Sequence, residues 1–183
     1  MYFLSCWIKV RKLERKKYCW FFQTHVDNEN SASSFVENIL IILSNLPPGL
    51  RSPIIRSRLN EFLSFESAEK KEIIQNVFAN YGKIDNQALL NIFDSWLNSL
   101  TEMKSDEIST IFYSYMIEIA LKPSLINTFK QDLVMSMTSV LNRIPTYKRI
   151  KILDCFFESI LNTPNPKLIL RVVPTTILEM MYK

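Results

Sequence analysis

Few side chains in this sequence combine a reactive type with a spacing that supports catalysis. The single histidine, His25, lies in a polar stretch that would not hold it against a nucleophile. Asp154 and Glu158 are four residues apart and share one face of a helix, which is a spacing that two metal ligands can use. Two carboxylates with no histidine or third acid are more typical of a solvated face. We therefore predict no catalytic residue, no cofactor and no metal ligand.

Other candidate groups are predicted to be structural. Cys155 borders an apolar stripe and is expected to be an unreactive core thiol. Glu118 falls off the apolar stripe of its helix and is expected to face water. Met116, Met135 and Met137 are expected to fill gaps in the core, because the flexible thioether side chain adapts to irregular spaces.

Composition excludes several classes of protein. The chain has 183 residues, of which 48% are hydrophobic and two are glycine, so it has enough apolar surface for a core but cannot form a glycine-rich phosphate loop. The three cysteines, Cys6, Cys19 and Cys155, include no CxxC pair, which argues against a zinc site or a disulfide framework. Free thiols suit a reducing compartment, and we predict a cytoplasmic protein, with a position at a membrane surface as the alternative.

The charge is concentrated near the N-terminus. Residues 1–24 carry six basic residues against one acidic residue, a net charge of +5, whereas the 16 basic and 17 acidic residues elsewhere give −1. Aromatic residues are interleaved with these cations. Three interpretations remain open: contact with an anionic membrane surface, contact with nucleic acid, or a docked or disordered tail without such a role. The candidate contact residues are Lys9, Arg11, Lys12, Arg15, Lys16 and Lys17.

Residues 25–33 are polar and lack periodicity, which predicts a linker. From residue 34 onward the apolar residues recur at helical spacing and predict a single all-α domain over 34–183 with seven to eight antiparallel helices. Ser34 and Glu37 match a capping box, Pro53 a first helical position, Gly82 a left-handed C-cap and Asp85 an N-cap. The expected helices are 34–46, 53–63, 67–81, 86–100, 105–121, 124–142 and 146–161, followed by two short pieces within 167–182.

Two stretches of the chain resemble each other at a separation of 98 residues. The apolar-proline pair Leu46-Pro47 matches Ile144-Pro145, and Arg51 matches Arg149. If both stretches face the same way, their arginines line one edge that could hold an acidic peptide or a phosphate. The alternative is that each arginine lies over its own helix or caps a preceding one. The candidate edge residues are Arg51, Arg56, Arg58 and Arg149.

The repeated turn resembles the helix–turn–helix units of armadillo and HEAT-like superhelical domains. It also looks like the helix starts of flagellar motor-switch proteins and of the cytosolic part of bacterial magnesium transporters. The resemblance covers residues 34–162 and implies a right-handed superhelix that docks protein partners. The unit starts near 46, 65, 100 and 144 are unevenly spaced, so a plain helical bundle is the alternative.

These patterns together predict a non-catalytic helical scaffold or protein-interaction module. The alternative is a peripheral membrane or nucleic-acid-associated protein that acts through its N-terminal segment. A homo-oligomer is a further option, because the helix expected over 35–46 is apolar nearly all round and two subunits could share it.

Overall fold

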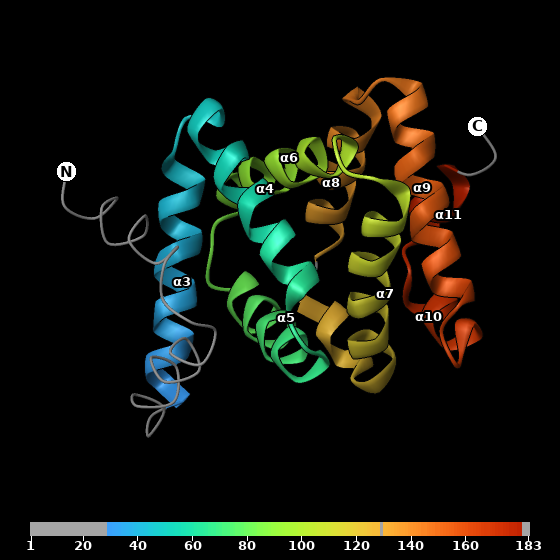
Figure 1. Ribbon diagram of the computed structural model, residues 1–183, viewed down its shortest axis with the longest axis horizontal. Coiled ribbons are helices and arrows are strands. Elements are labelled where there is room, and N and C mark those ends of the chain that lie inside the picture. The colour runs from blue at the N-terminus through green and yellow to red at the C-terminus, as the bar shows by residue number, and fades with distance from the viewer. Residues whose placement is uncertain (1–28, 129, 181–183) are drawn as a thin grey trace. The chain divides into compact units, whose positions relative to one another are not determined.

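The computed structural model describes residues 29–128 and 130–180, and its side chains are described from residue 37 with a gap at 126–129. Those residues form an all-α fold with no strand, which confirms the predicted fold class (Figure 1). The chain divides between Phe35 and Val36 into two compact units, and residues 36–183 contain the helical core.

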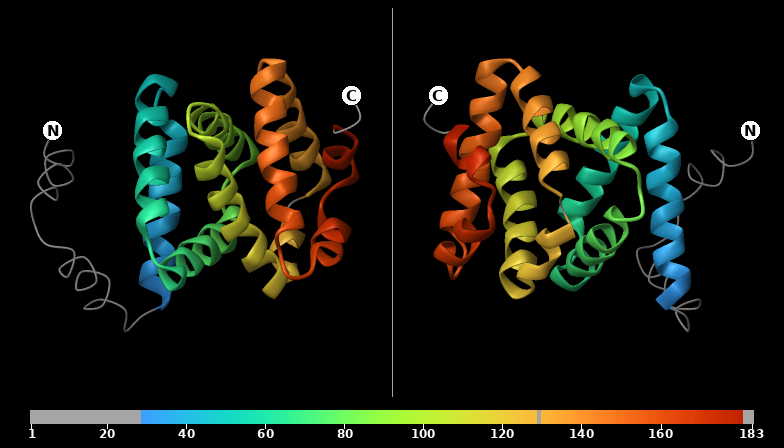
Figure 2. Two further views of the ribbon diagram at one scale, coloured as in Figure 1. Left: turned by 45° about the vertical axis from the view of Figure 1, so that its right-hand side comes forward. Right: turned by 180° about the vertical axis from the view of Figure 1, so that it is seen from behind.

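Eight of the described helices have seven residues or more, and α8 and α9, which a tight turn joins, run antiparallel (Figure 2). Their bounds are α3 Glu29–Asn45, α4 Pro48–Ser64, α5 Ser67–Tyr81, α6 Asn86–Thr101, α7 Ser105–Leu121, α8 Gln131–Arg143, α9 Thr146–Leu161 and α10 Pro166–Val172. A 3-10 helix, η2, covers Pro123–Thr128, and the short helix α11 covers Thr175–Glu179. The two short pieces predicted near the C-terminus are thus present.

Local capping explains several helix starts. The side chain of Asp85 accepts hydrogen bonds from the backbone N–H groups of Gln87 and Ala88 at 2.8 and 3.0 Å, which confirms its predicted role as an N-cap. These bonds satisfy donors that the first turn of a helix leaves unpaired. Asn165 caps α10 in the same way by accepting from the N–H of Leu168.

Four boundary predictions are wrong. Helix α3 begins at Glu29, so residues 29–33 are helical rather than linker and the Ser34 capping box is not at a helix start. Pro48 takes the first-turn position of α4, which leaves Pro53 inside the helix. Gly82 has a φ of −67°, in the right-handed region. The predicted helix over 124–142 is instead η2 followed by α8, because Lys130 is extended between them.

The most extensive contacts join helices that lie two apart along the chain, such as α4 with α6 and α7 with α9. The hydroxyl of Ser159 donates to the carbonyl of Ser109 at 2.9 Å, and Cys155 Sγ lies 3.5 Å from the carbonyl of Ser105. Residue numbers rise along both helices in these pairs, so α7 and α9 run in the same direction. Small side chains at the interface allow this close packing.

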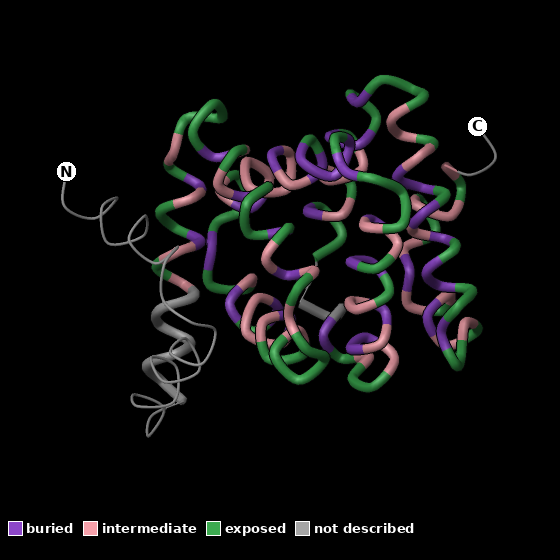
Figure 3. The backbone as a smooth tube through the Cα atoms, viewed as in Figure 1, coloured by how far each residue is buried: buried purple, intermediate pink, exposed green. Residues whose placement is uncertain are grey.

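Isoleucines and leucines fill the core that these helices share. Figure 3 shows buried positions alternating with exposed ones along the helices. Burial of each such side chain contributes roughly 1.5–3 kcal/mol. The fully buried apolar residues are Ile74, Leu100, Ile108, Ile111, Ile160 and Ile169. Cys155 and Met116 are buried as predicted and Met137 is partly buried, but Met135 is 59% exposed, so the prediction that it fills the core is wrong.

An aromatic cluster joins three of the helices. The ring of Tyr115 on α7 lies 6.2 Å from that of Phe62 on α4 and 6.4 Å from that of Trp96 on α6. Burial raises the pKa of the Tyr115 hydroxyl to about 12. Burial also raises the pKa of Tyr81, on α5, and the nearby Tyr115 adds to this shift.

Glu118 is buried, whereas the sequence predicted that it faces water. It is 5% exposed and accepts a hydrogen bond from Gln75 Nε2 at 2.8 Å. The prediction failed because α7 packs against α5, η2 and α9, so more than one side of this helix is covered. The amide of Gln75 supplies the hydrogen bond that a buried carboxylate needs.

Candidate functional site

Arg51 lies near the start of α4 and is only 4% exposed. Its guanidinium donates to two carbonyls at the end of α3, Leu43 O at 2.7 Å and Ser44 O at 3.2 Å, and to Leu46 O in the turn that follows at 2.5 Å. The last carbonyls of a helix have no partner within the helix and carry partial negative charge, so a cation is favourable there.

The remaining bonds of Arg51 reach α6. Its Nη1 donates to the carbonyl of Asn91 at 2.5 Å and lies 3.3 Å from Ser95 Oγ. Arg51 therefore links the end of α3 to α6, with neutral oxygens as its acceptors. Because its guanidinium is enclosed, the prediction that Arg51 lines a partner-binding edge is wrong.

Arg56 and Arg58 lie on exposed parts of α4. Arg56 Nη1 is 3.4 Å from Glu102 Oε2, and Arg58 forms an ion pair with Glu61. Partial burial lowers the pKa of Arg58, against the opposing effect of Glu61. Both pairs are exposed, and surface pairs of this kind contribute little to stability. The structure does not bring these two arginines and Arg51 into one edge.

Arg149, the counterpart of Arg51, is only partly buried. Its Nη1 donates to the carbonyl of Asn142 at 3.4 Å and to Asn142 Oδ1 at 3.2 Å. Asn142 stands 98 residues after Ser44, so the bond from the arginine to the end of the preceding helix occurs in both turns. No bond from Arg149 to a third helix is present in the part of the chain that the structure describes.

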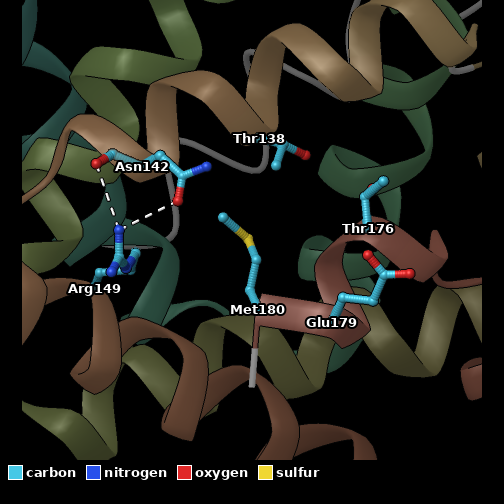
Figure 4. A pocket seen from close by; sticks show the side chains of 6 residues that line it. All are labelled: Thr138, Asn142, Arg149, Thr176, Glu179 and Met180. Carbon is cyan, nitrogen blue, oxygen red and sulfur yellow. Dashed lines mark hydrogen bonds between the residues drawn. The ribbon is translucent and has the colours of Figure 1, made fainter. Parts of the chain in front are cut away.

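A pocket of about 180 Å³ adjoins Arg149, between α8, α9 and α11 (Figure 4). The lining residues are Thr138, Asn142, Arg149, Thr176, Glu179 and Met180. Figure 4 shows Met180 between Arg149 on one side and Glu179 on the other. The hydroxyl of Thr138 already donates to Val134 O at 2.9 Å, so it can only accept a further bond. The pocket thus offers donors on one side and a carboxylate on the other.

The outward face of α9 is partly apolar. Tyr147, Ile150 and Leu161 are 72%, 51% and 67% exposed, and their spacing places them along one side of the helix. The exposed carboxylates of Asp154 and Glu158 lie on the same side, and Glu158 accepts a bond from Ser109 Oγ at 2.9 Å. We call these five residues the α9 face.

Other predicted candidates lie elsewhere. His25 and the six basic residues from Lys9 to Lys17 lie outside the described residues. Within the described residues no three metal-ligating side chains gather, and no helix there is long and apolar enough to span a membrane. The contribution of α11 to the pocket was missed, because the sequence gives no sign of where this five-residue helix packs.

Comparison with family models, curated proteins and solved structures gave no match.

Proposed function

We propose that this protein is a non-catalytic helical scaffold that binds a protein partner through the α9 face. The observation that supports this is the exposure of Tyr147, Ile150 and Leu161 along one side of a single helix. Large apolar side chains that gather on a surface are typical of interaction sites, because covering them releases water from apolar surface.

The charges on this face indicate the chemistry of the partner. Asp154 and Glu158 stand among the three apolar residues and are both exposed. A partner surface with apolar side chains and lysine or arginine between them is complementary to this pattern. Aromatic and large aliphatic residues such as Tyr147 commonly act as anchors at the centre of such interfaces.

We further propose that the helices form a superhelical stack of the armadillo or HEAT type. The parallel pairing of α7 with α9, and the repeated turn before α4 and before α9, support this interpretation. In such stacks each unit packs on its neighbours, and a continuous ridge or groove binds the partner. The three cysteines, which include no CxxC pair, support placing the protein in a reducing compartment such as the cytoplasm.

The α9 face can be tested with two matched triple variants. The first replaces Tyr147, Ile150 and Leu161 with serine, and the control replaces the exposed Leu50, Leu121 and Met135 with serine. Partners captured from the native cell with the wild-type protein are purified and their affinities for both variants are measured. We expect the first variant to lose at least tenfold in affinity and the control to retain binding.

Equal binding by both variants would contradict the proposal. Circular dichroism and thermal unfolding show whether each variant folds, since all six side chains are exposed and their loss should leave the core intact. If the captured partner is a second copy of this chain, sedimentation of the two variants reports the same comparison as a change in oligomeric state.

A second candidate function rests on the +5 net charge of residues 1–24. This segment is proposed to bind an anionic membrane surface or nucleic acid through its lysines and arginines. Deletion of residues 1–28 should abolish binding to phosphatidylserine vesicles or to single-stranded nucleic acid, and binding by the full chain should fall steeply with salt. Unchanged binding after the deletion would exclude this function.

A further inference from the structure

The two related arginines differ in what covers them. Arg51 is held by the end of α3 on one side and by α6 on the other, where Asn91 O and Ser95 Oγ face its Nη1. Arg149 is held by the end of α8 through Asn142. In place of a second helix it has the pocket beside α11 (Figure 4).

The turn between α3 and α4 shows to which atoms an enclosed arginine donates hydrogen bonds in this fold. All of the atoms that receive bonds from Arg51 are neutral oxygens, namely four backbone carbonyls and one hydroxyl. A helix can offer a carbonyl and a hydroxyl on the same face when a serine lies four residues after that carbonyl. Ser95 follows Asn91 in this way. The second lone pair of that carbonyl is free to accept from the guanidinium.

The lining of the Arg149 pocket favours the same class of acceptor. Glu179 contributes a carboxylate, which repels a phosphate or another free anion. The volume of about 180 Å³ is too small for a helix, which is about 10 Å across, so a helix can lie only over the opening of the pocket. Met180 supplies an apolar surface between the two charges. A helix that presents a carbonyl, a hydroxyl and a basic side chain matches this arrangement better than an anion does.

We propose that a helix of the partner protein lies over the opening of the Arg149 pocket and presents a carbonyl and, four residues later, a serine or threonine hydroxyl to the guanidinium. This inference rests on the proposed scaffold function, since it names the chemistry by which the partner is recognised. Arg149 and Ile150 are consecutive residues of α9, so their side chains leave the helix about 100° apart and the pocket lies to one side of the α9 face. A basic side chain of the same helix donates a hydrogen bond to Glu179.

Helix α6, which bonds Arg51 in the turn between α3 and α4, supplies the sequence of the probe. A fluorescently labelled, amidated peptide with the sequence of α6, residues 86–101, carries the Asn91 and Ser95 pattern. Its binding to the full chain is measured by fluorescence anisotropy. The comparison uses Arg149→Met, with Arg143→Met as the control, because Arg143 is exposed on α8 and does not line the pocket.

We expect saturable binding that weakens about tenfold in R149M and is unchanged in R143M, because hydrogen bonds from a charged group are the stronger kind. The peptide with Ser95→Ala should bind the wild-type protein more weakly than the unaltered peptide does. The two peptides should bind R149M equally well. Inorganic phosphate at millimolar concentration should not compete. Absence of binding, equal binding to both variants, or displacement by phosphate would each overturn the inference.

Failure of this test is distinguishable from failure of the proposed function. If the α9 face variant loses its partner while R149M keeps both partner and peptide, the scaffold function stands and the pocket is not part of it. If R149M loses the peptide while the α9 face variant keeps its partner, the pocket binds a helix but the proposed face is wrong.

Discussion

The turn from α3 to α4 and the turn from α8 to α9 share a sequence pattern but differ in their surroundings. Both have an apolar residue and a proline before the second helix, and both have an arginine that donates to a carbonyl of the first. In the first turn α6 packs against α4 and encloses Arg51. In the second, a pocket bordered by the short α11 leaves Arg149 partly exposed.

This difference shows that a local motif fixes which bonds an arginine makes to its own turn, but not whether it is buried. Burial depends on a third helix that comes about 40 residues later in the chain, as Asn91 does after Arg51. The same residue type therefore stabilises the fold in one turn and is available for binding in the other.

The largest difference between the two turns is expected when each guanidinium is removed and most of the aliphatic stem is kept. Arg51→Met should lower the free energy of unfolding by about 3 kcal/mol, because it leaves buried carbonyls without donors. Arg149→Met should change it by less than about 0.5 kcal/mol, as is usual for exposed positions. Urea denaturation followed by circular dichroism measures both.

For a chain of this size the first change corresponds to a decrease in Tm of about 6–12 °C. Unchanged stability in Arg51→Met would contradict the account. It would mean that an apolar side chain replaces the buried charge without penalty, as is known for some buried charges.

Alkaline pH should weaken the first region through Tyr115, whose ring packs against α4, which carries Arg51, and against α6, which helps to enclose it. Its folded-state pKa of about 12 lies above the unfolded value of about 10, so its contribution to stability is complete below pH 10 and is lost between pH 10 and 12. We expect the wild type to lose about 2 kcal/mol more than Tyr115→Phe by pH 12, because Tyr81, whose pKa is also raised, is present in both. Equal alkaline losses in both proteins would refute this.

A smaller effect should follow from removing one acceptor of Arg51. Ser95→Ala should destabilise the protein by about 1 kcal/mol, since Ser95 Oγ lies 3.3 Å from Nη1. Combining it with Arg51→Met in a double-mutant cycle should give a coupling of about 0.5–1.5 kcal/mol. Strictly additive effects in denaturation experiments would show that this contact contributes nothing.

The smallest effect concerns Gly49, whose counterpart in the second turn is Tyr147. An added Cβ at Gly49 would meet no atom within 4 Å, and its φ is not positive. Gly49→Ala should therefore stabilise the fold by about 0.5 kcal/mol, because alanine has less conformational freedom in the unfolded chain. A decrease in stability on thermal unfolding would argue against this backbone geometry.

Much of the helical framework could be predicted from the sequence. Apolar periodicity correctly indicated α5, α6 and α9, and the short side chain of Asp85 marked the start of α6. These features depend on residues close together in the chain, where spacing and capping chemistry act directly.

Features that depend on distant contacts could not be predicted. Glu118 was placed in water because its own stripe excludes it, yet Gln75 on α5 provides it with a partner. Arg51 and Arg149 look alike in sequence, and only the packing of α6 and α11 separates them. A single sequence does not reveal which helices meet when their separation exceeds 40 residues.

Arginine side-chain NMR tests the central claim most directly. In a protein with ¹⁵N-labelled arginine, the Nε–H of Arg51, which donates to Leu43 O at 2.7 Å, should exchange with water far more slowly than the Nε–H of Arg149. The loss of one resonance in R51M and of another in R149M assigns the two signals. Slow exchange at Arg51 with fast exchange at Arg149 is the predicted result, and equal exchange rates at the two would contradict the distinction between an enclosed and an open turn.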